Sequence, residues 1–171
     1  AWDEALHRRS PPSTPAIRDY PDAHAREHSL EMQLPFLATF APQCLIVPIV
    51  MGFQTRETAF EIGDAIATVL AGRRALLVAS SDLSHFYDAT TAAALDEQVL
   101  ARVESLDDHG LMELLERRPD HACGGGPMVS ILRAARALGA SQSRVLRYAD
   151  SGDVSGDKSS VVGYMAAGIW R

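Results

Sequence analysis

Two short polar segments hold the side chains of this sequence that are best suited to chemistry. Residues 80–85 read Ser-Ser-Asp-Leu-Ser-His and follow an apolar run, whereas residues 123–127 read Cys-Gly-Gly-Gly-Pro and precede a helical pattern. Together they supply a carboxylate, an imidazole and a thiol, which serve as metal ligands, acid–base groups or nucleophiles. Because such groups are costly to bury without partners, we expect both segments to form loops at a functional site.

The first segment places an aspartate and a histidine three residues apart. Asp82 and His85 follow the run 75–79, which we predict to be a buried strand, and ligands of open α/β sheets bind at the carboxyl ends of strands. Asp82 can there orient the imidazole of His85 as a general base or a metal ligand. The competing interpretation is that Asp82 caps a following helix and His85 is a polar surface residue.

The second segment places a cysteine before three glycines and a helix that we expect to start at Pro127. Glycines let the backbone approach a ligand closely, and a helix N-terminus stabilises an anion such as a thiolate. Cys123 is therefore a candidate soft metal ligand. The alternative is a glycine-rich turn beside a cysteine that acts as a small apolar residue.

A serine hydrolase is the competing enzyme class, because serine, aspartate and histidine all occur in residues 80–85. The sequence contains no G-x-S-x-G elbow. An aspartate and a histidine only three residues apart also cannot easily line up in series behind the serine. We therefore disfavour this class.

Two weaker patterns also suggest a site. His28 and Glu31 lie one helical turn apart, a spacing found in metal and acid–base pairs but equally in ordinary helix surface pairs. Asp150, Asp153 and Asp157 do not match the spacing of a calcium-binding loop, so we interpret them as a solvated turn.

Apolar spacing predicts the elements that position these groups. A helical pattern begins near Glu27, with a kink or a restart at Pro35. Cys44 falls at the start of an apolar run and is expected in the core. Alternating strands and helices predict a layered α/β fold with a largely parallel sheet. The predicted strands span 44–50, 75–79, 144–149 and 161–170; the other helices lie near 55–72, 95–106, 107–119 and 127–139.

The composition of the chain indicates which partners we do not expect it to bind and in which cellular compartment we expect it. The chain has 171 residues, enough for one domain, and a net charge of −6, which argues against a phosphate-backbone binder. No apolar stretch approaches the length of a membrane span, and two cysteines are too few for a disulfide framework, so we expect a cytoplasmic protein.

Residues 1–24 are proline-rich and predicted to be an irregular lead-in. Since the chain starts at Ala1 rather than methionine, we expect a fragment.

Four segments in order resemble the Memo family, and most closely its branch called AmmeMemoRadiSam system protein B. They are residues 27–35 (EHSLEMQLP), 80–85, 123–127 and 148–164. The resemblance implies a fold like that of class III extradiol ring-cleaving dioxygenases, which is a three-layer α/β/α arrangement around a mostly parallel or mixed central sheet.

The resemblance also implies a role for each candidate residue. Cys123 matches the family's metal-ligating cysteine. Asp82 and His85 match the catalytic pocket pair, and His85 is at the position of the dioxygenases' catalytic histidine. The pocket residues implied in the same cleft are His28, Glu31, Ser81 and Gly124. The implied cofactor is non-haem iron or copper, which gives a dioxygenase-like function.

The resemblance covers only the C-terminal part of the family's domain. We therefore expect a single Memo-like domain over 1–171 that is incomplete at its N-terminus and lacks two further metal-binding histidines. Metal binding by these residues alone is expected to be weak or absent. The alternative function is a non-catalytic partner- or peptide-binding module, whose implied partners are an AMMECR1-type protein and a radical SAM enzyme.

Overall fold

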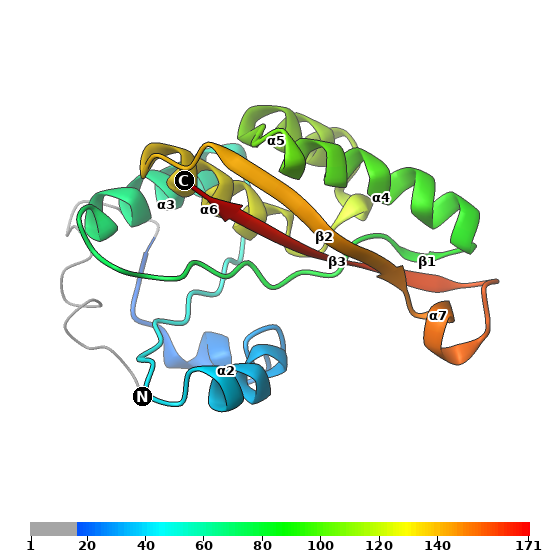
Figure 1. Ribbon diagram of the computed structural model, residues 1–171, viewed down its shortest axis with the longest axis horizontal. Helices are drawn as coiled ribbons and strands as arrows, with labels where there is room; N and C mark the ends of the chain where they lie inside the picture. Colours follow the sequence, from blue (N-terminus) through cyan, green and yellow to red (C-terminus); the bar gives the residue numbers. More distant parts are fainter. Residues whose placement is uncertain (1–16) are drawn as a thin grey trace.

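The computed structural model describes residues 17–171, in which helices lie on one side of a small sheet (Figure 1). Residues 1–16, most of the predicted lead-in, lie outside the described part. In chain order the described elements are the 3₁₀ helices η1 (Pro21–His24) and η2 (Glu31–Gln33), α2 (Leu34–Phe40), α3 (Arg56–Leu70), β1 (His85–Tyr87), α4 (Ala89–Glu104), α5 (Asp108–Arg117), η3 (Pro119–His121), α6 (Gly125–Ala137), β2 (Gln142–Asp150), α7 (Gly152–Ser155) and β3 (Val161–Trp170).

The sheet is antiparallel, so the prediction of a mostly parallel central sheet in three layers is wrong. The strand order is β1-β3-β2, and β3 pairs antiparallel with both neighbours. A short connection that holds only the single-turn helix α7 joins β2 to β3. Such a connection makes a hairpin, whereas parallel neighbours need a crossover of a dozen or more residues.

The two apolar runs predicted as parallel strands do not join this sheet. In the part of the chain that the structure describes, residues 75–79 form no strand, and within 44–50 only Ile46 takes part in an isolated bridge. Pro48 lacks a backbone donor for a ladder. The side chains of Leu76 and Val78 are 78% and 51% exposed, and Cys44, predicted to lie in the core, is exposed as well. Without a paired neighbour strand, an apolar run does not become a strand.

The helices follow the sequence patterns closely. Thr55 caps α3 by accepting a hydrogen bond from the Thr58 amide, and Asp107 caps α5 in the same way through Gly110. Pro35 lies in the first turn of α2, which confirms the predicted restart after the 27–33 segment. These local signals need no distant partner, which explains why the sequence predicts them.

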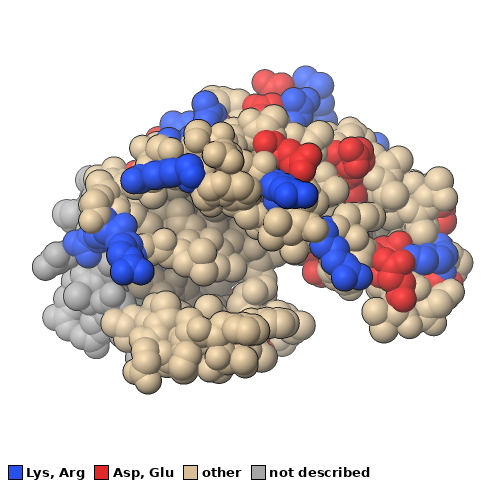
Figure 2. Space-filling view, in the orientation of Figure 1, with Lys and Arg blue, Asp and Glu red and all other residues tan. Residues whose placement is uncertain are grey.

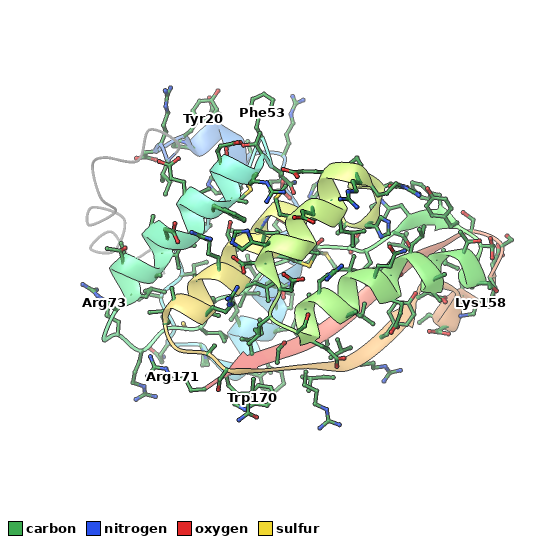
Figure 3. All side chains as sticks on the ribbon, turned by 90° about the horizontal axis from the view of Figure 1, so that it is seen from above. Tyr20, Phe53, Arg73, Lys158, Trp170 and Arg171 are labelled. Atoms are coloured by element: carbon green, nitrogen blue, oxygen red, sulfur yellow. The ribbon has the colours of Figure 1, made fainter. Side chains whose placement is uncertain are left out.

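One continuous core lies between the helices and the sheet. Helix α4 packs on β2 and β3, α3 packs against α6, and α5 contacts both α4 and α6; Figure 3 shows these helices side by side over the sheet. The buried apolar side chains that link them include Ala59, Leu83, Val99, Leu111, Met128, Val129 and Leu132. None of the helices described is long and apolar enough to cross a membrane.

A separate lobe contains η1, η2 and α2 and lies opposite the helical layer (Figure 1). Figure 2 shows the surface hollowed between this lobe and the rest, and the lobe presents few charged residues on that face. Its apolar side chains Phe36 and Phe40 are exposed. The lobe contacts the main body at residues 80–85, because Ser80 donates a hydrogen bond to the Ser29 carbonyl and accepts one from Gln33.

Candidate functional site

The two polar segments that the sequence singles out meet in space. Candidate ligand atoms of Asp82, His85 and Cys123 all lie within 4.8 Å of one another. Asp82 belongs to the loop before β1, His85 is the first residue of β1, and Cys123 lies in the loop between η3 and α6. The loop before β1 and its first residue thus supply the carboxylate and the imidazole, and the loop between η3 and α6 supplies the thiol.

Cys123 and Asp82 are joined through their backbones as well as their side chains. The Cys123 amide donates a hydrogen bond to the Asp82 carbonyl at 3.3 Å. In return the Asp82 amide donates one to Cys123 Sγ, also at 3.3 Å. Cysteine binds metals through its sulfur, as the thiolate. The thiol is exposed, so an ion can reach it from solvent.

The imidazole of His85 has a nitrogen that no described residue satisfies. Its Nε2 is buried without a hydrogen-bond partner among these residues, and the Asp82 carboxylate lies 3.7 Å away, beyond hydrogen-bond range. The next residue, Phe86, has a φ of +66°, and the β1–β3 register shifts between His85 and Tyr87. Such a bulge redirects a side chain, and a strained backbone beside a polar group is typical of functional sites.

The capping interpretation of Asp82 is wrong. The helix that follows, α4, begins at Ala89 and is capped by Asp88, whose side chain accepts hydrogen bonds from the Thr90 and Thr91 amides. Asp82 is therefore not needed as a cap, and its carboxylate faces His85 and Cys123.

Two of the predicted pocket residues contact this group directly. Ser81 Oγ accepts a hydrogen bond from the Gly124 amide at 2.8 Å and lies 3.9 Å from Cys123 Sγ. A Cβ on Gly124 would come within 2.7 Å of the Ser81 Cβ, so only glycine allows this approach. Ser81 and Gly124 thus hold the two loops together beside the thiol.

The other two predicted pocket residues form a pair of their own. His28 Nδ1 and Glu31 Oε2 are 3.5 Å apart, and both side chains are largely exposed. Neither belongs to the group formed by Asp82, His85 and Cys123. Their lobe is connected to the site through Ser29 and Ser80, so a role of His28 and Glu31 in the cleft stays a prediction.

A second polar contact ties the His85 strand to the Cys123 loop. The Tyr87 hydroxyl donates a hydrogen bond to Asp120 Oδ2 at 2.6 Å, and Arg118 donates two to the same carboxylate. The Arg118 guanidinium, with the Tyr87 hydroxyl second, holds the pKa of Asp120 well below its usual range. This contact joins β1 to η3, the elements next to His85 and Cys123.

Acid is expected to destabilise the fold through such carboxylates. Asp120 and Asp153 have lowered pKa values, the latter because of hydrogen bonding by Lys158, which lies beside α7 in Figure 3. A depressed carboxyl pKa gives stability that is present above the unfolded value, about 3.9, and is lost as the pH falls through the folded value. Urea unfolding should therefore show a nearly constant free energy from about pH 7 to 5 and a decrease below about pH 4.

The Asp120→Asn variant is the control for this pH dependence. It should be less stable than the parent at neutral pH and should lose less stability between about pH 5 and 3, because the titrating carboxylate is gone. A parent chain as stable at pH 3 as at pH 7 would contradict the assignment.

Two residues that the sequence analysis missed hold the segments of the site in place. Asp96, fully buried on α4, accepts hydrogen bonds from the Ser84 amide and the Tyr148 hydroxyl. Gln54 bonds to both ends of residues 123–126. An aspartate inside the apolar face of α4 was a signal that could have identified Asp96, whereas nothing in the local sequence distinguishes Gln54.

His121 is a further buried histidine near Cys123, but it has a structural partner. Its Nδ1 lies 3.0 Å from the Leu95 carbonyl oxygen, which fixes η3 to α4. His121 is not part of the group formed by Asp82, His85 and Cys123. It therefore anchors the loop that holds Cys123.

The donor set suits a divalent transition metal. Thiolate, imidazole and carboxylate are all common ligands, and protein ligands lie about 2.0–2.3 Å from such an ion, so two of them are at most about 4.6 Å apart. The spread of 4.8 Å is close to this limit, and small side-chain rotations would close it. The unsatisfied Nε2 of His85 gives a lone pair for the ion.

The Memo-like protein family has a sequence profile that matches residues 3–168 of this chain. The chain belongs to the Memo-like protein family. Similar MEMO1 family proteins occur in Methanosarcina mazei (44% identical over 146 residues), Methanopyrus kandleri (42% over 147) and Methanothermobacter thermautotrophicus (41% over 144). The alignments cover 84%, 84% and 83% of this chain, respectively.

Within the Memo-like family this chain is short. The same alignments cover 55%, 52% and 52% of the respective relatives, so the chain spans about half the length of the curated relatives it matches. The predicted family is confirmed, as is the prediction that the chain matches part of a family member.

Proposed function

We propose that this Memo-like protein binds a redox-active divalent metal, iron or copper, through Cys123, His85 and Asp82 in a dioxygenase-like cleft. The observation that supports the proposal best is the convergence of the three donor atoms within 4.8 Å. A soft thiolate beside an imidazole suits copper and iron better than magnesium or calcium, which prefer oxygen ligands. When bound, such a metal would supply oxygen activation for the oxidation of a small molecule.

The residues of this chain have distinct tasks in the proposed site. Cys123 anchors the ion from an exposed loop. His85 presents its buried Nε2 to the same point, and Asp82 either completes the ligand set or orients the imidazole, as the sequence analysis predicts. Since the exposed side of the cluster is open to solvent, a substrate would approach from there.

Metal analysis of the purified chain tests the proposal. In anaerobic equilibrium dialysis against an excess of iron(II) or copper(II), the parent should bind up to about one ion per chain, weakly as expected for a site with only three ligands, and the Cys123→Ala variant much less. The Cys44→Ala variant is a matched control, because Cys44 is equally exposed but lies outside the cluster. Equal metal content in the parent and Cys123→Ala would refute the role of Cys123.

A second candidate function is a non-catalytic module that binds a peptide or a partner protein. The exposed ring of Phe86, which directly follows His85 and contacts its imidazole edge-on, favours this alternative. The partners proposed for it are an AMMECR1-type protein and a radical SAM enzyme, in the cytoplasm. Calorimetry with a purified AMMECR1-type protein discriminates the two: binding that is lost in His85→Ala while metal content is unchanged would support the module.

A further inference from the structure

Gln54 spans the loop that holds the candidate thiol. This residue lies just before α3, far from Cys123 in the sequence. Its Nε2 donates a hydrogen bond to the Cys123 carbonyl at 2.8 Å, and its Oε1 accepts one from the Gly126 amide at 2.7 Å. A single planar amide thus fixes both ends of a four-residue segment, and neither contact involves the thiol itself.

The absence of a side chain on Gly126 allows the close approach of Gln54 and Met51. A Cβ on Gly126 would lie 2.5 Å from Met51 Sδ and 3.0 Å from the Gln54 Cβ. The Gly126 amide is in the first turn of α6, where backbone donors have no partner within the helix. Gln54 supplies that partner, so its hydrogen bond couples the start of α6 to the position of Cys123.

The opposite side of the same loop is held by Ser81. Its hydroxyl accepts a hydrogen bond from the Gly124 amide and donates one to the Asp82 carbonyl. Residues 123–126 are therefore held by a polar side chain on each flank, Ser81 from the loop that contains Asp82 and Gln54 from the loop before α3. Together with the hydrogen bonds between Cys123 and Asp82, these two contacts fix the loop that carries the sulfur.

We propose that Gln54 is a positioning residue that sets the direction of the Cys123 sulfur toward Asp82 and His85. The proposal rests on the proposed metal-binding function and adds a residue that contacts no candidate ligand atom. Residues that orient metal ligands typically change metal affinity about 10- to 100-fold when they are replaced. Gln54 should belong to this class.

Cobalt(II) is a suitable probe, because thiolate ligation gives a sulfur-to-metal charge-transfer band in the near ultraviolet. In titrations of the full chain, Gln54→Ala should weaken cobalt affinity about 10- to 100-fold and reduce this band at saturation. Gln54→Glu is nearly isosteric but directs a carboxylate oxygen at the Cys123 carbonyl, so the same loss is expected. Thermal unfolding of each variant checks that it is folded.

The control is Gln98→Ala. Gln98 is an exposed glutamine of α4 whose amide donates a hydrogen bond to the Ala94 carbonyl within its own helix, so cobalt affinity and the band should be unchanged. A folded Gln54→Ala variant that matches Gln98→Ala would refute the positioning role alone. A parent chain that binds cobalt without a thiolate band, or not at all, would instead refute the proposed metal function and the positioning role with it.

Discussion

The Asp96→Ala variant is expected to lose about 2–5 kcal/mol in its free energy of unfolding, because it leaves the buried Ser84 amide and the half-buried Tyr148 hydroxyl without a partner and a fully buried unpaired group costs about 1–3 kcal/mol. Asp96 is fully buried, and its two oxygens accept hydrogen bonds from the Ser84 amide at 2.9 Å and the Tyr148 hydroxyl at 2.7 Å. Burial, and then the contact with Asp96, raise the pKa of Tyr148 well above its usual range, so the hydroxyl remains a donor. Urea unfolding of parent and variant measures the difference.

Two further variants separate the hydrogen bonds of Asp96 from its size. Asp96→Asn keeps an oxygen that accepts from the Ser84 amide, and its NH₂ group can donate to the Tyr148 hydroxyl, which reverses the direction of that hydrogen bond. This variant should therefore lose clearly less stability than Asp96→Ala. Gly163→Ala should be as harmful as Asp96→Ala, because its Cβ would lie 1.9 Å from Asp96 Oδ2. An Asp96→Ala variant as stable as the parent would show that these contacts contribute nothing.

The same contacts connect stability to the site. Ser84 lies between Asp82 and His85, and its carbonyl accepts a hydrogen bond from the Gly163 amide of β3. The segment is thus attached to α4 through Asp96 and to the sheet through Gly163. Loosening either attachment should therefore weaken metal binding at the site in addition to destabilising the fold.

Local signals were sufficient to predict the helices. The caps Thr55 and Asp107, and Pro127 in the first turn of α6, act within a few residues, so the sequence alone identifies them. The strands 75–79 and 44–50 were mispredicted because an apolar run indicates burial against a partner, and the described residues provide none. The strand propensity of a segment depends on its own residues, whereas strand pairing depends on a second segment that can be distant in the sequence.

The site shows the same division between local and distant information. Asp82, His85 and Cys123 were predicted because each lies in a polar segment at the end of an apolar one. Asp96 and Gln54 contact those segments from positions remote in the sequence, and only the fold brings them together. Sequence patterns therefore indicate candidate ligands more readily than the residues that orient them.

The His85→Ala variant is expected to bind cobalt(II) more than about 100-fold more weakly than the parent, a loss beyond the range typical of residues that only orient a ligand. The reason is that Nε2 is buried, lies 3.7 Å from the Asp82 carboxylate and has no hydrogen-bond partner among residues 17–171, so a metal is the partner that fits it. His109→Ala is the control, since this histidine is exposed and packs against the Phe60 ring, away from the cluster. If His85→Ala instead keeps the parent's cobalt affinity while Cys123→Ala loses it, His85 is not a ligand, and the acid–base role predicted from the Asp82–His85 spacing gains support.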